Sequence, residues 1–295
     1  WYGARMTASH ERLEKRHGPV TDLFPRSGDD RSPWELSDGQ LSFFHEHGYV
    51  KGGRVLDEGQ IEALREGLEA IRTGENPRVG ELYEIDEDYR KAPDRNLFHF
   101  LGAWLIDDGL HDVLWHPAIA AKAAQLLGVR RVRFWHDQVF YKPARHPGVV
   151  TWHQDYSYWT RSTPAGHLTC WIGLDDSTEE NGCLKYVPGS HRWGLLPKIS
   201  LTKDMDAVKE YLTPEQYEAF HPVSMVLKAG ECTFHHSHTV HGSYGNRSDG
   251  PRRGVVLNFM RPDTRSADGE TPLLTGVPVI PEGEVIAGDH FPLLT

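Results

Sequence analysis

The sequence predicts an α+β protein in which a layer of helices precedes a strand-rich jelly roll or barrel. Up to about residue 128, apolar residues recur at spacings of three and four, the period of an amphipathic helix. After residue 130, short segments rich in β-branched and aromatic residues alternate with Pro, Gly, Asn and Asp, as many strands separated by turns would. Because helices come first and strands follow, we expect the helices to buttress one face of a sheet.

A single domain is the preferred organisation. The chain has 295 residues and shows no internal repeat, low-complexity run or convincing linker. Residues 1–35 are assigned to an N-terminal arm, because residues 6–33 are polar and contain Pro and Gly. The opening WYGAR precedes Met6, so residues 1–5 are interpreted as a candidate tag remnant. Residues 36–295 then form the domain.

Three helices are expected in the N-terminal half. The first spans 36–50: Ser37 or Asp38 can cap it, Gly48 ends it, and its apolar side consists of Leu41, Phe43 and Phe44. The second spans 56–74, with apolar residues at Ile61, Leu64, Leu68 and Ile71. The third spans 116–128, is rich in Ala and ends at a glycine.

Strands are expected in five later segments, at 132–143, 167–176, 182–190, 224–236 and 253–262. A helical insert is expected near 203–220, between the third and fourth of these. Many short strands with turns between them favour a closed or double-layered sheet.

The composition excludes several classes of protein. The formal net charge is −10 and no stretch is strongly basic, so nucleic acid is not an expected partner. Three cysteines without a CxxC pair argue against a disulfide framework. No apolar run is long enough for a membrane span or a signal peptide. We expect a cytoplasmic protein, monomeric or homodimeric, with a small-molecule substrate.

The octapeptide WHQDYSYW, residues 152–159, contains a candidate metal-binding pair. Successive side chains of a strand point to opposite faces, so His153 and Asp155 share one face and Gln154 points away. Two ligands from one strand can reach one metal ion. An HxD triplet is common by chance, however, so the pair alone favours an ordinary polar patch.

A third ligand is expected from the histidine-rich stretch 230–254. Gly230 opens a turn before an expected strand that contains His235, His236, His238 and His241. One late histidine added to an HxD pair completes a facial triad of two histidines and one carboxylate, typical of non-haem Fe(II) oxygenases. A zinc site made of all four late histidines is awkward, because alternation separates His236 and His238 from His235 and His241.

Two further stretches, ENGCLKYVPGSHR and HGSYGNRSDGPR, resemble the matching parts of the phytanoyl-CoA dioxygenase family. The resemblance extends over roughly residues 36–262. It implies a double-stranded β-helix (a jelly roll, cupin-like) and an Fe(II)- and 2-oxoglutarate-dependent oxygenase. In that family the distal metal histidine opens an HxS segment, which here begins at His241. The resemblance therefore implies an iron site of His153, Asp155 and His241.

The same resemblance implies a site for the cosubstrate 2-oxoglutarate. In the family an arginine eleven residues after the distal histidine binds the far carboxylate, and that position is Arg252, with Arg253 as the alternative to be excluded. Ser243, Trp171 and Gln138 match positions that border the cosubstrate. A planar guanidinium also suits bidentate binding of a carboxylate. Three protein ligands leave three positions on an octahedral iron, two for the 2-oxo acid and one for O₂.

The expected reaction is the oxidation of a C–H bond, by hydroxylation or oxidative ring closure, with release of succinate and CO₂. Halogenases of the family have a small residue in place of the ligand carboxylate, so Asp155 argues against halogenation. Alternation turns Tyr156 and Tyr158 away from the metal. It brings Trp159, and Ser157, toward the metal if the strand continues that far.

The substrate is expected to be a small natural product or a sugar-like molecule, with Trp159 and Trp135 as candidate contacts. One alternative is an acyl-CoA 2-hydroxylase of the same family, although no basic patch for the CoA phosphates is evident. Another is a jelly-roll carbohydrate-binding module without redox chemistry, which leaves the spacing of Arg252 unexplained. A third is a pseudoenzyme that binds zinc or no metal.

Overall fold

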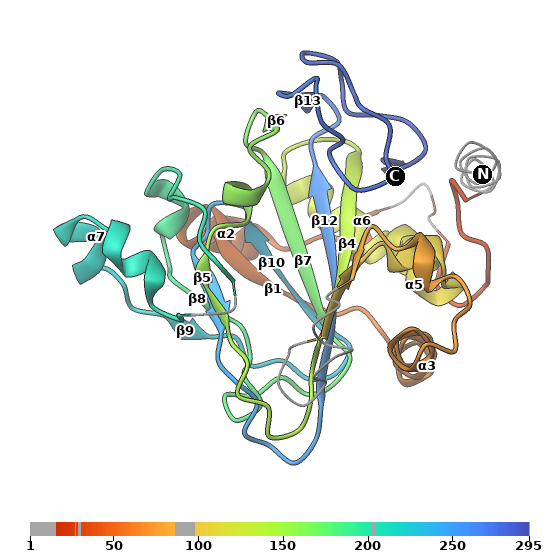
Figure 1. The fold of residues 1–295 in the computed structure, drawn as a ribbon, viewed down its shortest axis with the longest axis horizontal. Coiled ribbons are helices and arrows are strands. Elements are labelled where there is room, and N and C mark those ends of the chain that lie inside the picture. The colour runs from red at the N-terminus through yellow and green to blue at the C-terminus, as the bar shows by residue number, and fades with distance from the viewer. Residues whose placement is uncertain (1–15, 27, 29–30, 86–97, 202–203, 295) are drawn as a thin grey trace.

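The computed structural model describes residues 16–26, 28, 31–85, 98–201 and 204–294. A large antiparallel sheet of eight strands runs through the molecule, and a four-stranded antiparallel sheet lies on one side of it (Figure 1). The large sheet has the order β1-β10-β7-β12-β4-β3-β2, and β14 also pairs with β4. The small sheet has the order β5-β11-β8-β9, and β13 pairs with β6 separately. The fold is therefore a mixed α+β fold with antiparallel sheets.

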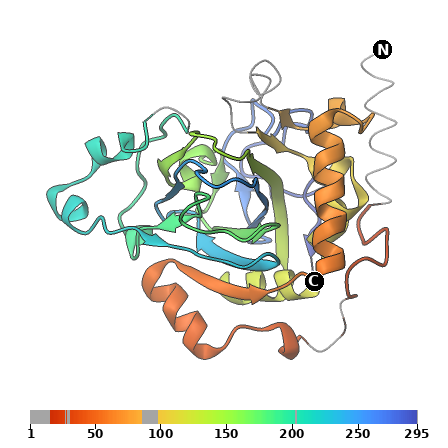
Figure 2. The same ribbon diagram turned by 90° about the horizontal axis from the view of Figure 1, so that it is seen from below.

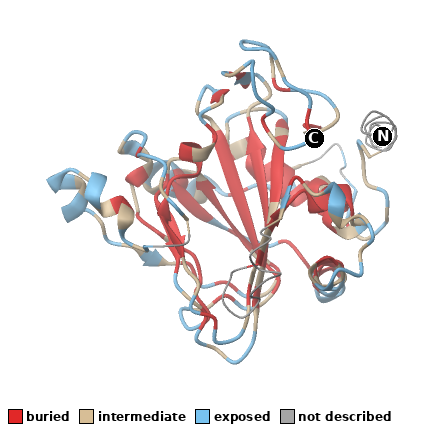
Figure 3. Cartoon of the chain, in the orientation of Figure 1, coloured by how far each residue is buried: buried red, intermediate tan, exposed pale blue. Residues whose placement is uncertain are grey.

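The strands of the large sheet are β1 (Tyr49–Arg54), β2 (Glu84–Ile85), β3 (Phe98–Leu101), β4 (Val132–Lys142), β7 (His167–Gly173), β10 (Glu231–His236), β12 (Arg252–Met260) and β14 (Leu293–Leu294). Those of the small sheet are β5 (Val150–His153), β8 (Lys185–Tyr186), β9 (Val223–Ser224) and β11 (His241–Ser243). The remaining pair is β6 (Ser162–Thr163) and β13 (Arg265–Ser266). The central strands β7 and β12 are buried almost throughout (Figure 3), as their Val, Ile and aromatic content requires.

Two of the expected helices begin at capping boxes. Helix α2 (Asp38–His47) is capped by Ser37 together with Gln40, and α3 (Glu58–Thr73) is capped by Asp57 together with Gln60. Left-handed glycines follow both helices, as predicted for Gly48. The predicted apolar side of the first helix was partly wrong: Phe44 is buried, but Phe43 is 39% exposed, because only one narrow stripe of this short helix contacts the sheet.

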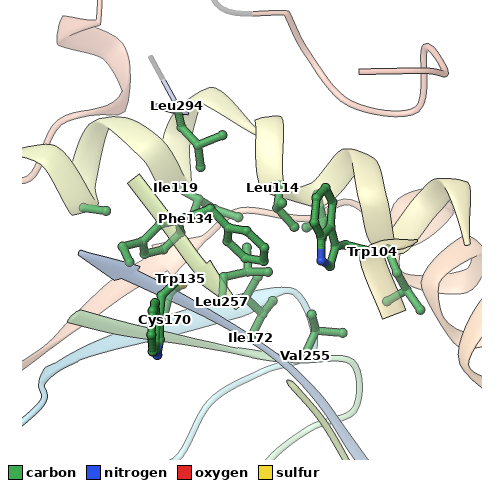
Figure 4. Packing of buried hydrophobic residues seen from close by; sticks show 14 of the residues in the cluster. Trp104, Leu114, Ile119, Phe134, Trp135, Cys170, Ile172, Val255, Leu257 and Leu294 are labelled. Carbon is green, nitrogen blue, oxygen red and sulfur yellow. The ribbon is translucent and has the colours of Figure 1, made fainter. Parts of the chain in front are cut away.

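Helix α3 and two helices near it cover the outer face of the large sheet, away from the small sheet, whereas the short helix α7 (Pro214–Glu218) lies on the side of the small sheet (Figures 1 and 2). Helix α6 (Pro117–Leu126) contacts both β4 and β7, and the short helix α5 (Asp108–Asp112) packs against α3. Phe134, Leu257 and Ile119 meet between the sheet and α6 (Figure 4). Trp135, the neighbour of Phe134 on β4, extends from the other face of its strand and so leaves the helical layer.

The histidine-rich stretch does not form the single strand that was expected. Strand β10 ends at His236, and the chain turns back through a hydrogen bond from the Thr239 amide to the His236 carbonyl. It then enters β11 at His241. The turn moves the chain from the large sheet to the small one, so His235 and His241 approach each other from opposite layers.

The helical insert is shorter than predicted. Within 204–220 there are a 3₁₀ turn, η7 (Ala207–Tyr211), and one short helix, α7 (Pro214–Glu218). Pro214 explains the division, because a proline is tolerated in the first helical turn but not inside a helix, and Thr213 before it is extended. Residue 203 of the predicted insert lies outside the described residues.

The described part of the N-terminal arm packs onto the helical layer. The Asp112 carboxylate accepts hydrogen bonds from the amides of Val20 and Thr21, and Phe24 is buried in the main core. The rest of the predicted arm up to residue 15, including the candidate tag remnant, lies outside the described residues. Among the helices that the structure does describe, none has the length and apolar character required to cross a bilayer.

Candidate active site

Three side chains converge between the two sheets. His153 ends β5, Asp155 begins the 3₁₀ turn η5 (Asp155–Tyr158), and His241 begins β11 directly opposite His153 in the strand pairing. One ligand atom from each residue lies within 4.8 Å of the others. The Asp155 Oδ1 atom is 3.4 Å from His153 Nε2 and 3.6 Å from His241 Nε2. This is a set of two imidazoles and one carboxylate around one point.

The backbone fixes both imidazole rings. His153 Nδ1 donates to the Thr151 carbonyl at 2.7 Å, and His241 Nδ1 donates to the Thr239 carbonyl at 3.0 Å. A ring whose Nδ1 carries the proton has its lone pair on Nε2, and both Nε2 atoms face Asp155. Hydrogen bonds of this kind orient the histidine ligands of metal sites.

The protonation states also suit a metal. Burial, followed by the neighbouring imidazoles of His153 and His235, lowers the pKa of His241 well below its usual 6.5. Burial by itself raises the pKa of the Asp155 carboxyl, but the imidazoles of His241, His153 and His235 outweigh it and hold that pKa well below 3.8. A neutral imidazole and an ionised carboxylate are the forms that bind a metal ion.

The local route to this geometry differs from the predicted strand alternation. Strand β5 ends at His153, so the 3₁₀ turn, and not a continued strand, brings Asp155 back toward it. Gln154 does point away: its amide donates to the Gly194 and His238 carbonyls. The prediction that Tyr158 turns away was wrong, because the turn places its ring 5.8 Å from that of His153. Ser157 lies in the same turn and donates to the Gln154 carbonyl.

One cavity of about 530 Å³ contains all the predicted site residues. Its walls include the three converging residues and His153's neighbour Tyr158. They also include the expected cosubstrate and substrate contacts, namely Arg252, Ser243, Trp171, Gln138, Trp159 and Trp135. Residues from both sheets, from η5 and from the C-terminal segment meet there, so the cavity exists only in the folded chain.

Arg252 lies at one end of this cavity and is 1% exposed. Its Nη1 donates to the Gly182 carbonyl at 2.7 Å, and its guanidinium lies 5.2 Å from the centre of the Trp171 ring. Within the described chain, its Nε has no hydrogen-bond partner. Burial lowers its pKa to about 10. The adjacent Arg253 points elsewhere and forms hydrogen bonds with Asp175, which separates the two candidates.

Lys142 was missed by the sequence reasoning. It lies opposite Arg252 in the pairing of β4 with β12 and is fully buried. Its Nζ donates to the Ser243 hydroxyl at 2.8 Å and to the Tyr244 carbonyl. Burial, followed by repulsion from Arg252, lowers its pKa well below 10.5. The one signal in the sequence was a lysine at the end of an apolar strand.

The two buried basic side chains, Arg252 and Lys142, lie opposite each other on paired strands and have no carboxylate beside them in the described part of the chain. Among the ion pairs found in the described residues, none joins a carboxylate to Arg252 or Lys142. A buried positive charge without a counterion is costly, whereas a bound carboxylate would pair with it. The free Nε of Arg252 adds an unused donor. This end of the cavity therefore fits the carboxylate of a small acid.

Several aromatic rings line the rest of the cavity, together with polar side chains. The rings of Trp135 and Trp159 lie edge to face with centroids 6.5 Å apart. Gln138 lies on the wall and its Oε1 is 2.9 Å from His99 Nε2. The sequence reasoning missed several further lining residues: Arg161, Lys198, Ile199, Leu273 and Leu274. None of these had a motif that could have marked it.

Comparison with known proteins gives the family. Residues 44–254, more than half of the chain, match the profile of phytanoyl-CoA dioxygenase (PhyH). The chain belongs to the phytanoyl-CoA dioxygenase family. It is 26% identical over 257 residues to a phytanoyl-CoA dioxygenase of Arabidopsis thaliana, covering 77% of this chain and 90% of that protein. It is 28% identical over 232 residues to a methylphosphonate hydroxylase of Gimesia maris, covering 76% and 80%.

Two solved structures share the fold. The α-ketoglutarate-dependent carbocyclase SnoK from nogalamycin biosynthesis superimposes with a TM-score of 0.68 at 27% identity, covering 88% of this chain and 97% of SnoK. The epimerase SnoN, solved with Fe³⁺, α-ketoglutarate and a nogalamycin compound, gives a TM-score of 0.69 at 27% identity, covering 90% and 100%. The chain is thus an Fe(II)- and 2-oxoglutarate-dependent dioxygenase that uses O₂, and the carbohydrate-binding module and the pseudoenzyme lose their support.

Proposed function

We propose that the protein oxidises a C–H bond of a small natural-product or sugar-like substrate on a double-stranded β-helix, by hydroxylation or oxidative ring closure. In this proposal His153, Asp155 and His241 hold the iron, and Arg252 binds the far carboxylate of 2-oxoglutarate. The observation that carries it is the cavity itself, because two buried imidazoles and a carboxylate line it together with the buried Arg252, which has no carboxylate partner among the described residues, and with Ser243, which Lys142 contacts.

The residues present fit an iron ion. Two Nε2 atoms and one carboxylate oxygen face one point, and the remaining directions open into the cavity. When bound, the iron supplies the activation of O₂ coupled to oxidative decarboxylation of 2-oxoglutarate. The chain contributes the orientation of the ligands, through the backbone carbonyls of Thr151 and Thr239.

The residues at the other end fit 2-oxoglutarate. Arg252 presents its unused Nε and the charge of its guanidinium, and Trp171 covers the face of that group. Lys142 holds the Ser243 hydroxyl beside it through a hydrogen bond from its Nζ. Gln138 and Trp171 line the space between this end and the metal ligands. Arg252, Lys142, Ser243 and Trp171 are all buried, and this exclusion of water strengthens the charged hydrogen bonds.

The substrate proposal rests on the aromatic end of the cavity. Trp135, Trp159 and Tyr158 offer rings against which a cyclic substrate can pack. The relatives SnoK and SnoN belong to nogalamycin biosynthesis, which supports a natural product as the substrate. Asp155 fills the position that halogenases of the family leave small, so oxidation without halogenation is proposed. We further propose that residues 36–295 act as one domain in a monomer or homodimer.

The test uses the protein purified without oxygen. Addition of Fe(II) and then 2-oxoglutarate should produce a visible charge-transfer band, and admission of O₂ should release succinate, faster with the true substrate in a panel of metabolites. Asp155→Ala should lose both signals. The matched control Asp249→Ala removes an exposed carboxylate that pairs with Arg145, and should keep them. Wild-type protein without band or succinate would refute the proposal.

A further inference from the structure

A row of polar side chains crosses the centre of the large sheet. His136 on β4, Asn258 on β12, Thr169 on β7 and His235 on β10 lie directly opposite one another in the strand register. All four are at most 3% exposed. Polar groups this deep in a sheet are costly unless each is hydrogen-bonded. Packing of the sheet alone therefore does not explain why these four positions are polar.

The reason lies in what two of these residues bind. The Thr169 hydroxyl donates to Asp155 Oδ2 at 2.6 Å, and His235 Nε2 donates to the same oxygen at 2.9 Å. Thr169 has a single hydroxyl proton, and the charged carboxylate takes it in preference to the Asn258 amide oxygen at 2.9 Å. The other oxygen, Oδ1, faces His153 and His241. One carboxylate oxygen is thus occupied by the large sheet, and the other is left for the metal.

The His235 ring is itself held in the state that this role needs. Its Nδ1 accepts a hydrogen bond from the Tyr186 hydroxyl at 3.1 Å, so its proton lies on Nε2, facing Asp155. Tyr186 is fully buried, and its ring stacks on that of Tyr49 at 4.7 Å between centroids. Burial raises the pKa of Tyr186 well above 10, so this hydroxyl remains a donor. Tyr186, which belongs to the small sheet, therefore holds the His235 ring in this orientation.

The position of Asp155 explains why such support is required. His153 and His241 belong to paired strands, whereas Asp155 lies on a 3₁₀ turn outside the ladder of β5. A carboxylate on a turn can rotate and bind a metal through one oxygen or two. Bidentate binding would fill a position that the proposed cosubstrates need.

We infer that Thr169 and His235 are positioning residues that clamp Oδ2 of Asp155 and so restrict this carboxylate to binding iron through Oδ1 alone. The same contact keeps His235 out of the ligand set, although its ring centre is 4.2 Å from that of His241. The inference rests on the proposed ligand set. It adds two residues from two further strands to the machinery of the site.

The experiment measures metal binding apart from turnover. Fe(II) and Co(II) affinities of the apo protein are determined by anaerobic calorimetry for Thr169→Val and His235→Leu, which each remove one donor. Loss of partners that orient a metal ligand costs roughly 10- to 100-fold in affinity, which is the weakening expected here. Thr169→Ser and His235→Gln each keep a donor and should bind within about threefold of wild type, because the bond to Oδ2 is what matters.

Structural and spectroscopic controls complete the design. His238→Leu changes a nearby histidine whose ring packs on Tyr156, and should leave metal affinity unchanged. Thermal unfolding of each apo variant verifies the fold, and Thr169→Val is nearly isosteric. X-ray absorption of the Co(II) protein should show two imidazoles in wild type, and a longer or two-oxygen carboxylate contact in the variants that lack a donor.

The outcomes distinguish failure of the clamp from failure of the proposed function. If wild type binds Fe(II) and both variants bind it equally well, the clamp is refuted and the proposed function stands. If three imidazoles coordinate the metal in wild type, the clamp is refuted and the proposed ligand set is wrong. If wild type binds no Fe(II), the proposed function fails and the clamp fails with it.

Discussion

Substitution of Gly254 would test most directly how Trp171 packs against Arg252 at the proposed 2-oxoglutarate site. It lies near the start of β12, and the Trp171 ring covers it. A Cβ added at Gly254 would lie 2.6 Å from Trp171 Cε2 and 2.9 Å from Nε1, with Cζ2 closer still. Ordinary contact begins near 3.4 Å, so the ring would have to move by at least about 0.8 Å.

The cost follows from what surrounds Trp171. The ring is 3% exposed and packs in a cluster with Val256, Leu184 and Tyr186, so it cannot move freely. Overpacking of this kind costs about 1–3 kcal/mol of unfolding free energy. The ring also covers the Arg252 guanidinium, and such a contact contributes about 0.5–2 kcal/mol. Its displacement should raise the Kd for 2-oxoglutarate roughly 2- to 30-fold.

The assay compares Gly254→Ala with Gly250→Ala. Gly250 lies just before β12, and an added Cβ there would meet nothing within 4 Å. Urea unfolding gives the stability, and titration of the charge-transfer band gives the Kd. In the Trp171→Phe variant the atoms that clash with the added Cβ are absent. Gly254→Ala should therefore lower the free energy of unfolding less in this variant than in wild type. Equal stability and equal Kd for Gly254→Ala and Gly250→Ala would refute the reasoning.

Three further perturbations address other parts of the molecule. Arg252→Met should raise the KM for 2-oxoglutarate at least about 30-fold. Arg253→Met loses the ion pair with Asp175, which lies outside the cavity, and should leave this KM within a few-fold of wild type. Equal effects of the two variants would mean that Arg252 is not the residue that binds 2-oxoglutarate. Burial lowers the pKa of His116 to about 4. Between about pH 6.5 and pH 4 this histidine is therefore protonated in the unfolded chain but neutral in the folded chain. The free energy of unfolding should fall as the pH drops through this range. His116→Asn keeps a capping side chain for α6 and should remove up to about 3 kcal/mol of that loss, measured by urea unfolding across this range; an unchanged slope would contradict it. Trp159→Ala should raise the KM for the substrate and leave the consumption of 2-oxoglutarate without substrate unchanged. If only the consumption of 2-oxoglutarate changed, Trp159 would contact the cosubstrate and not the substrate.

Local features of the sequence were sufficient for most of the secondary structure. The second helix was predicted at 56–74 and is found at Glu58–Thr73, because its capping residue, apolar spacing and terminal glycine all lie within one continuous stretch. The long strands β4 and β7 fall inside predicted segments for the same reason, and β12 exceeds its predicted segment only by Arg252. The helix 108–112 and the break near Pro214 were missed, because short elements depend on packing more than on their own periodicity.

The sequence by itself determined the chemical character of the protein. The HxD pair, a late histidine that opens an HxS segment and an arginine eleven residues later are spacings along the chain, and they indicated the family without coordinates. The tertiary structure decided which side chains meet. Lys142 reaches Ser243, and Thr169 and His235 reach Asp155, only because strand register and the turn after His236 bring separate layers together. It also reversed the orientation of Tyr158, since alternation holds along a strand and ends where the strand ends.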